Sequence, residues 1–137
     1  MARAGSRDDF RARNLASLRS AVRKDLNRRT FAKGTTIFAE GEVGTVAYIL
    51  LRGDVTIYLG FGTGHQRTIT ELKPGEMFGV HALMAGAQRA ASAVTMQGCE
   101  VLAVSESKLK QKLDEADPFL RYWVDYLSKR VIDLSTQ

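Results

Sequence analysis

Short runs of strand-forming residues, separated by glycines, recur from about residue 30 to residue 104. β-Branched and aromatic residues dominate these runs, as in Thr36-Ile37-Phe38 and Tyr48-Ile49-Leu50. Glycine separators are typical of tight turns because glycine can adopt a positive φ. The predicted strands are residues 30–31, 36–39, 47–51, 55–59, 67–72, 77–78, 90–95 and 100–104. Eight strands at this spacing predict a mainly β fold, a small antiparallel jelly roll (β-roll).

The N-terminal segment is predicted to form a basic helix. Asp8 or Asp9 can cap its first turn. Its apolar residues recur at steps of three and four, at Leu15, Leu18, Val22 and Leu26. The first 30 residues carry nine basic and three acidic side chains, a net charge of +6, whereas the other 107 carry eleven basic and twelve acidic ones. We interpret the arginines as a solvated face of a helix that packs its leucines on the roll; a nucleic-acid or membrane surface is the alternative.

Two more helices are predicted after the roll. Ser105 is expected to cap a helix over residues 106–115. Asp117 followed by Pro118 predicts a second start, because Asp caps a helix and Pro suits its first position, and this helix extends to about residue 134. It carries two apolar stripes, and one chain can hardly bury both. The first is a short a/d seam of Leu120, Val124, Leu127, Val131 and Leu134, and the second consists of Phe119, Trp123 and Tyr126.

The stretch from residue 77 to residue 94, here called the cassette, is suited to hold an anion. Gly79 permits a backbone conformation closed to other residues. The amides at the start of a short helix predicted over residues 80–84 point outward without partners. Arg89 supplies a fixed, forked charge that suits a phosphate group. The cassette therefore predicts a phosphate site.

The cassette and the glycine spacing resemble the cyclic-nucleotide-binding domains of catabolite activator protein, protein kinase A regulatory subunits and gated ion channels. The resemblance covers about residues 28–134. In the family the cassette has Phe-Gly-Glu, two small or apolar positions and Leu, a short loop, and then Arg, Ser or Thr, and Ala. The matching residues are Phe78, Gly79, Leu83, Arg89 and Ala91. Two positions depart: the family's glutamate, which accepts the ribose 2′-hydroxyl, falls on Val80, and its hydroxyl residue, which helps hold the cyclic phosphate, falls on Ala90.

The resemblance implies a non-catalytic site for a cyclic nucleotide, cyclic AMP in preference to cyclic GMP, with no other cofactor and no metal. The expected ligand-binding residues are Phe78, Gly79, Val80, His81, Ala82, Arg89, Ala90 and Ala91. Arg89, Gly79 and the amides of Val80 and His81 are expected on the phosphate. A lost charged acceptor is worth roughly 1.5–3 kcal/mol and a lost hydroxyl about 1 kcal/mol. The two departures together weaken binding by on the order of a hundredfold.

The resemblance also assigns the loops and the division of the chain. Arg52-Gly53-Asp54 is similar to the family's tight turn between its third and fourth strands. The run from Gly60 to Gly64 is similar to a hairpin tip, and no Lys-Thr pair or helix follows it as a phosphate loop would require. The expected division is a basic helical segment over 1–27, a β-roll over 28–104 and C-terminal helices over 105–137. The last helix is expected to act as a lid or homodimer contact through Leu120, Trp123, Val124, Leu127 and Val131.

Several other classes of protein are disfavoured. One cysteine, Cys99, and two histidines, His65 and His81, leave no disulfide framework and no tetrahedral zinc site, and Cys99 is expected to be buried in a strand. No apolar run approaches the roughly 20 residues of a membrane span, so a cytoplasmic protein is expected. No catalytic set of side chains is visible. The sequence reaches Gln137 before the family's helix-turn-helix would begin, so no DNA-binding domain is expected in this chain.

Three hypotheses for the function stay open at this point. The first is a cyclic-mononucleotide sensor that acts by ligand-linked movement of its C-terminal helix. The second is a degenerate domain of the same fold that serves as a dimerisation or protein-interaction module. The third is a site altered for another anion, such as a cyclic dinucleotide.

Overall fold

The computed structural model describes residues 9, 12–13, 15–16, 27–80, 82 and 88–135, and the side chains of 125 and 128–135 lie outside that description. The strands are β1 (Asn27–Phe31), β2 (Thr35–Phe38), β3 (Val46–Gly53), β4 (Val55–Leu59), β5 (Arg67–Leu72), β6 (Met77–Phe78), β7 (Ser92–Thr95) and β8 (Cys99–Ser105). The helices α3 (Glu106–Glu115) and α4 (Pro118–Ser135) follow. The predicted eight-stranded roll with two C-terminal helices is confirmed. Most of the predicted N-terminal helix lies outside the described residues.

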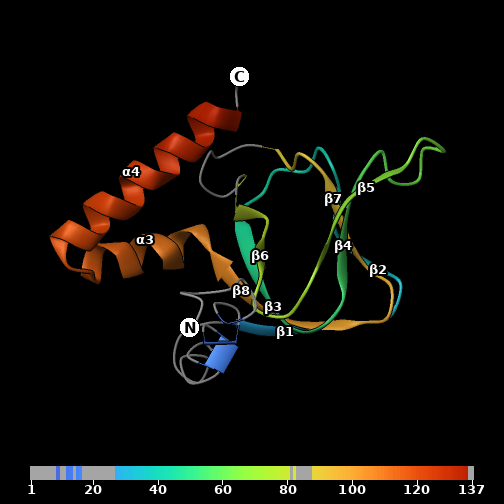
Figure 1. The fold of residues 1–137 in the computed structure, drawn as a ribbon, viewed down its shortest axis with the longest axis horizontal. Coiled ribbons are helices and arrows are strands. Elements are labelled where there is room, and N and C mark those ends of the chain that lie inside the picture. Colours follow the sequence, from blue (N-terminus) through green and yellow to red (C-terminus); the bar gives the residue numbers. More distant parts are fainter. Residues whose placement is uncertain are drawn as a thin grey trace, which may run out of the picture.

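Two four-stranded antiparallel sheets enclose the core (Figure 1). Their strand orders are β1-β8-β3-β6 and β2-β7-β4-β5. Both sheets contribute fully buried residues, such as Leu50 from β3 and Val55 from β4. An aromatic cluster lies at the centre, with ring centroids 5.2–6.3 Å apart, and consists of Phe31, Phe38, Tyr48 and Phe78. Burial of these side chains is the main force that closes the roll.

The described part of the N-terminal segment contacts the roll through Leu15. This side chain packs against a second buried cluster, formed by Ile49, Leu51 and Leu102. The contact agrees with the prediction that the apolar face of the segment packs on the roll. The other predicted packing residues, Leu18, Val22 and Leu26, lie outside the described residues.

Two strand boundaries differ from the predictions. β7 begins at Ser92 and not at residue 90, because Ala90 and Ala91 form a bend directly after Arg89. β1 begins at Asn27 and not at residue 30, because its backbone pairs with β8 from Asn27 opposite Ala103 onward. Pairing between strands uses backbone groups and does not require β-branched side chains, so the sequence pattern missed residues 27–29 of β1.

The turn at Arg52-Gly53-Asp54 is confirmed between β3 and β4. Gly53 has a φ of +92°, and a Cβ atom there would collide with the carbonyl oxygen of Gly98 in the β7–β8 turn. The carboxylate of Asp54 accepts hydrogen bonds from the amides of Met96 (3.0 Å) and Gln97 (2.9 Å). One carboxylate therefore holds two turns together at this end of the roll. The Gly60–Gly64 run forms the predicted β4–β5 hairpin tip, with His65 exposed.

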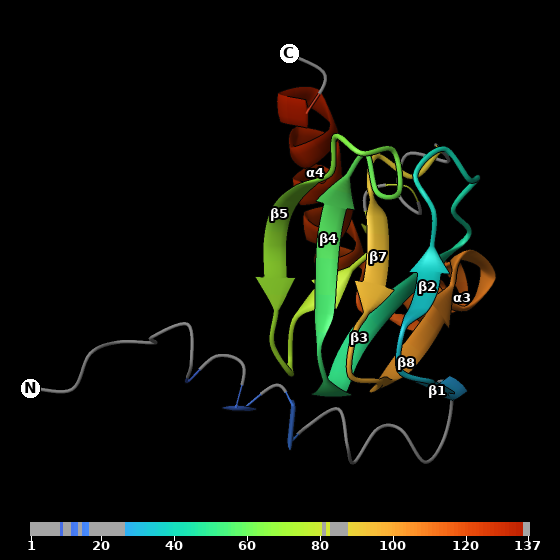
Figure 2. The same ribbon diagram turned by 90° about the vertical axis from the view of Figure 1, so that its right-hand side faces the viewer.

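The two C-terminal helices begin at the predicted caps. Ser105 accepts a hydrogen bond from the amide of Lys108 (3.1 Å), and Asp117 accepts one from Phe119 (2.8 Å). The amide of Glu106, at the start of α3, donates to the carbonyl oxygen of Thr45 (3.0 Å) beside β3. The two helices form an arm on one side of the roll (Figures 1 and 2). No helix in the described part of the chain is long and apolar enough to cross a bilayer.

Candidate functional site

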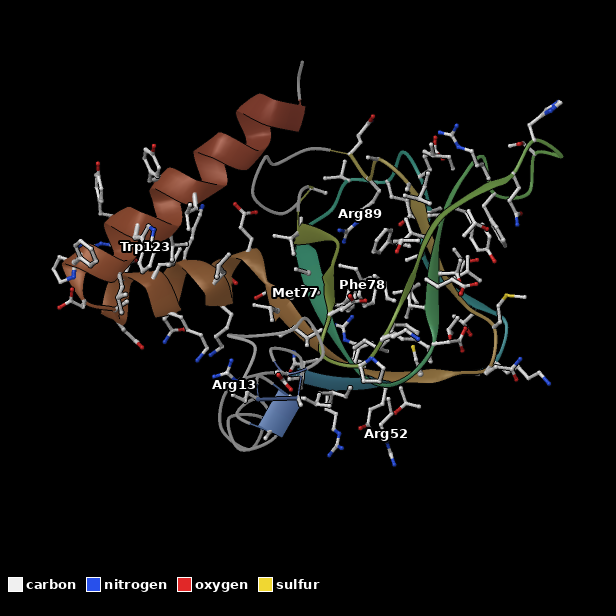
Figure 3. All side chains as sticks on the ribbon, in the orientation of Figure 1. Arg13, Arg52, Met77, Phe78, Arg89 and Trp123 are labelled. Carbon is white, nitrogen blue, oxygen red and sulfur yellow. The ribbon has the colours of Figure 1, made fainter. Side chains whose placement is uncertain are left out.

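A cavity of about 250 Å³ lies inside the roll, between β4, β5 and the cassette. Its lining residues are Phe38, Ile57, Thr70, Leu72, Met77, Phe78, Gly79, Ala82, Arg89, Ala90 and Ala91. Among these described residues only Arg89 and Thr70 have nitrogen- or oxygen-containing side chains. Figure 3 shows Arg89 and Phe78 together in the interior of the roll. The cavity is therefore an apolar chamber with one cation on its wall.

The guanidinium group of Arg89 is buried, with only 6% of the residue exposed. It donates to the carbonyl oxygen of Gly79 from Nη1 (2.9 Å) and to that of Val46 from Nη2 (2.6 Å). Its Cζ atom lies 4.1 Å from the centre of the Phe38 ring, a cation–π geometry. Burial lowers the pKa of Arg89, and the charges of Tyr48 and Glu42 partly offset this effect. The group stays charged because an arginine side chain does not deprotonate in proteins.

No carboxylate of a described residue forms an ion pair with Arg89. The buried charge is held by carbonyl dipoles and by one aromatic face, which compensate it only partly. Three of its five N–H donors make no bond to a described protein group. A buried and only partly compensated guanidinium group at the wall of a cavity is suited to bind an anionic ligand.

The backbone of Arg89 is fixed by the loop between β2 and β3. Its amide donates to the carbonyl oxygen of Glu42 (2.6 Å), and its own carbonyl oxygen accepts from the amide of Gly41 (2.8 Å). Two glycines leave room for the side chain. A Cβ atom on Gly44 would lie 2.7 Å from Cζ of Arg89, and one on Gly79 would lie 2.7 Å from Nη1. The position of the charge is thus set by backbone contacts on three sides.

The predicted cassette residues lie as follows. Phe78, Gly79, Ala82, Arg89, Ala90 and Ala91 all line the cavity. Gly79 has a φ of +78°, as its predicted role in the turn requires. Val80 is half-buried at the start of a helical turn and brings no acceptor to the site. His81 lies outside the described residues, as do residues 83–87 of the predicted short helix.

The sequence alone did not single out Phe38, Val46 or Gly44 as site residues. Phe38 was expected only as a strand residue and Gly44 only as a separator. Each contacts Arg89 across more than 40 positions of the chain, and no local pattern encodes such a distant contact. The alternation of β2 could have indicated that Phe38 points inward, but not that it faces a cation.

The predicted lid residues lie apart from the cavity. Leu120, Trp123, Val124 and Leu127 are all exposed on α4, and the side chain of Val131 lies outside the described residues. Figure 3 shows Trp123 on the helical arm, well separated from Arg89. The structure therefore brings the described cassette residues together, and none of the described side chains of α4 lines the cavity.

The sequence matches the family model described as a cyclic nucleotide-binding domain over residues 28–116. It is 36% identical over 77 residues to the Cyclic AMP receptor protein of Thermus thermophilus, and this matched segment covers 56% of this chain and 36% of that protein. It is 30% identical to the cAMP-dependent protein kinase regulatory subunit of Colletotrichum orbiculare, over 75% of this chain and 26% of that protein. The chain thus spans well under two thirds of the length of these relatives.

Solved structures show the same fold. A half-site-occupied form of the EAL enzyme Bd1971 superimposes with a TM-score of 0.73 at 28% identity, covering 80% of this chain and 98% of that one. The catabolite activator protein of Thermus thermophilus superimposes with a TM-score of 0.67 at 25% identity, covering 89% of this chain and 56% of that one. The sequence match, the roll and the Arg89 cavity lead to one conclusion: the chain belongs to the cyclic nucleotide-binding domain family.

Proposed function

We propose that this domain is a regulatory sensor that binds a cyclic mononucleotide, preferentially cyclic AMP, in the Arg89 cavity. The observation that carries the proposal is the buried guanidinium group, which lacks a carboxylate partner among the described residues. A ligand phosphate supplies the missing negative charge. The relatives support the choice of ligand, since Bd1971 has been solved in cAMP-bound and cGMP-bound forms at 28% identity.

The residues divide into two groups in this proposal. Arg89, Gly79 and the amides of Val80 and His81 hold the cyclic phosphate. The apolar wall, which includes Ile57 and Leu72, faces the ribose and the base. Because Val80 and Ala90 lack side-chain acceptors, we infer an affinity on the order of a hundredfold below that of a site with the family's glutamate and hydroxyl.

The cavity size favours a mononucleotide over a cyclic dinucleotide. Its volume of about 250 Å³ lies just below the range for small-molecule sites, which is roughly 300–1,000 Å³. A dinucleotide adds a second base and a second phosphate, and the cavity wall offers one cation. We therefore regard a cyclic dinucleotide as a less favoured ligand than a cyclic mononucleotide.

Isothermal titration calorimetry with cyclic AMP and cyclic GMP tests the proposal. We expect weak, measurable binding to the unmutated chain and none to Arg89→Gln, which removes the charge and keeps a polar side chain. Val80→Glu should strengthen binding by roughly 1.5–3 kcal/mol at best, because it restores the charged acceptor. Gln88→Ala, at an exposed neighbour of Arg89, is the matched control and should bind like the unmutated chain.

Thermal unfolding of each variant separates a lost ligand contact from a lost fold. Arg89→Lys retains the charge and serves as a second probe if Arg89→Gln unfolds. The proposal fails if the unmutated chain gives no heat at millimolar nucleotide and the Val80→Glu, Ala90→Ser double variant restores none.

The helix α4 favours an additional role in association. Seven large apolar residues between positions 119 and 127 are 39–69% exposed, and they form one wide apolar face on the first half of the helix. A wide exposed apolar face commonly marks an interaction surface. We infer that α4 pairs with a second copy of the chain and that its second stripe closes over the bound nucleotide. If the calorimetry shows no binding, this surface makes the interaction module the better hypothesis.

The proposed role is regulatory and not catalytic. The curated relatives named above are a receptor protein and a kinase regulatory subunit. The described residues that line the cavity include one hydroxyl and no carboxylate, histidine or cysteine. They therefore lack the groups from which a general base or an activated nucleophile is usually formed.

A further inference from the structure

The side chains on the wall of the Arg89 cavity are mainly apolar. Among the described lining residues, only Arg89 and Thr70 carry nitrogen or oxygen in their side chains. The rings of Phe38 and Phe78 line the cavity with their centroids 6.1 Å apart, and Ala91 adds a methyl group. The body of a ligand in this cavity therefore meets mainly carbon atoms of the described side chains.

Such a wall favours a ligand whose body is apolar. A polar ligand group that is buried without a partner weakens binding roughly five- to 150-fold, or about 1–3 kcal/mol. The described wall offers one side-chain hydroxyl, that of Thr70, to such groups. By contrast, each methylene group that is buried strengthens binding about fourfold, or about 0.8 kcal/mol.

The charge of the site selects the acidic group of the ligand. The guanidinium group of Arg89 is buried, and three of its N–H donors make no bond to a described protein group. A carboxylate carries one negative charge and can accept two parallel N–H bonds from a guanidinium group. A phosphate monoester carries a charge of about −1.5 to −2, and no second cationic side chain lies among the described lining residues. One carboxylate therefore matches the one cation.

The volume of the cavity limits the size of the apolar body. A cavity of about 150 Å³ can hold a benzene molecule. The Arg89 cavity, at about 250 Å³, has room for one aromatic ring with a short acidic chain, or for an alkyl chain of medium length.

We propose that the Arg89 cavity binds small monocarboxylates with an apolar body. The guanidinium group of Arg89 pairs with the carboxylate, and the body packs against Phe38, Phe78 and the other apolar side chains of the wall. This inference goes beyond the proposed function, because it gives the same cavity a second class of ligand. Since both classes use Arg89, a carboxylate and a cyclic nucleotide exclude each other.

Calorimetric titration of the full-length chain with butanoate, hexanoate and octanoate, at constant ionic strength and below the micellar range, tests the role of the body. The affinity should rise about fourfold for each added methylene group. Phenylacetate serves as the aryl ligand and shows whether a ring is accepted as well as an alkyl chain. Octylammonium has the same body as octanoate with the opposite charge, and it should not bind in the cavity.

Two variants test the place of binding. Arg89→Gln should lower the affinity for octanoate roughly tenfold or more, because it removes the charge-assisted pair. Arg67→Gln removes an exposed arginine from β5, outside the cavity lining, and is the matched control that should bind like the unmutated chain. If Arg89→Gln unfolds, Ala91→Leu keeps the charge and fills part of the cavity from a half-buried position. This variant should weaken octanoate more than butanoate.

The inference is overturned if affinity does not depend on chain length, if octylammonium binds as well as octanoate, or if octanoate binds both cavity variants as it binds the unmutated chain. The last result is expected if octanoate binds the exposed apolar face of α4 instead. Binding of cyclic AMP without binding of any carboxylate overturns this inference alone. Binding of octanoate without binding of any nucleotide overturns the proposed function alone.

Discussion

Gly44 leaves the space that the guanidinium group of Arg89 fills. A Cβ atom on Gly44 would lie 2.7 Å from both Cζ and Nε of Arg89 and 2.6 Å from Cβ of Ala82. Real Cβ contacts are longer than this, so a side chain at position 44 and the present position of Arg89 exclude each other. The position of the guanidinium group in the cavity therefore depends on Gly44, a residue that has no side-chain functional group.

Gly44→Ala should lower both stability and nucleotide affinity. The added methyl group overpacks the site, which costs about 1–3 kcal/mol of folding free energy, and it pushes Arg89 away from its two carbonyl partners. Chemical denaturation and calorimetry measure the two effects. Thr45→Ala, at the exposed neighbour, is the control. Unchanged affinity in Gly44→Ala would show that the ligand does not use Arg89 where it now lies.

Leu127→Asp should prevent association through α4. Leu127 is 49% exposed in the single chain, so a charge there costs the isolated fold little, but it is unfavourable inside an apolar contact. Sedimentation at micromolar concentration should shift to the smaller species. Lys110→Ala, on the exposed side of α3, should leave the distribution unchanged. An unmutated chain that is already monomeric at high concentration contradicts the α4 contact.

Glu100→Gln should flatten the loss of stability in acid. The hydrogen bond from Arg28 (2.6 Å) lowers the pKa of Glu100, burial opposes this, and the charges of Arg28 and Arg52 add to it. The folded pKa lies below the unfolded value, so the interaction stabilises the fold above the ordinary pKa of 4.5 and is lost as pH falls through the folded pKa.

Urea unfolding at neutral pH and near pH 3 measures this difference. The midpoint of the unmutated chain should fall more on acidification than that of Glu100→Gln. Glu115→Gln, at the exposed end of α3, is the control and should behave like the unmutated chain. Equal acid sensitivity in all three proteins would show that Glu100 does not contribute to the loss of stability in acid.

Cys99 should react slowly with Ellman's reagent while the protein is folded. Burial raises the pKa of its thiol, a hydrogen bond with Thr95 partly lowers it, and Asp54 raises it further. Little reactive thiolate is therefore exposed at neutral pH. The rate should rise to that of a free thiol in denaturant. Thr63→Cys supplies an exposed thiol for comparison, and equally fast reaction of Cys99 in the folded chain would contradict its burial.

Local signals account for the parts of the fold that the sequence predicted well. The caps at Ser105 and Asp117, the turn at Gly53 and the hairpin tip at Gly60 each depend on a few neighbouring residues, and all four were confirmed. The hydrogen bonds of the two caps are complete within a single turn, whereas the turn at Gly53 also contacts the distant β7–β8 turn through Gly53 and Asp54.

The partners of Arg89 could not be predicted in the same way. The sequence indicated an arginine suited to phosphate, but Val46 lies 43 positions away and Phe38 lies on another strand. Which backbone carbonyl meets a side chain depends on strand register, which a periodic pattern leaves undetermined. The position of α4 was likewise unpredictable, because its two apolar stripes do not specify what covers them.

Thr45 and Val46 are adjacent in the chain and serve different parts of the molecule. The carbonyl oxygen of Val46 accepts the hydrogen bond from Arg89, and that of Thr45 accepts the first amide of α3. Successive carbonyl groups of an extended backbone point in opposite directions. The guanidinium group of the cavity and the first amide of α3 therefore bind carbonyl groups that are joined by one peptide unit, so a change in the position of either group acts on the same short segment of backbone.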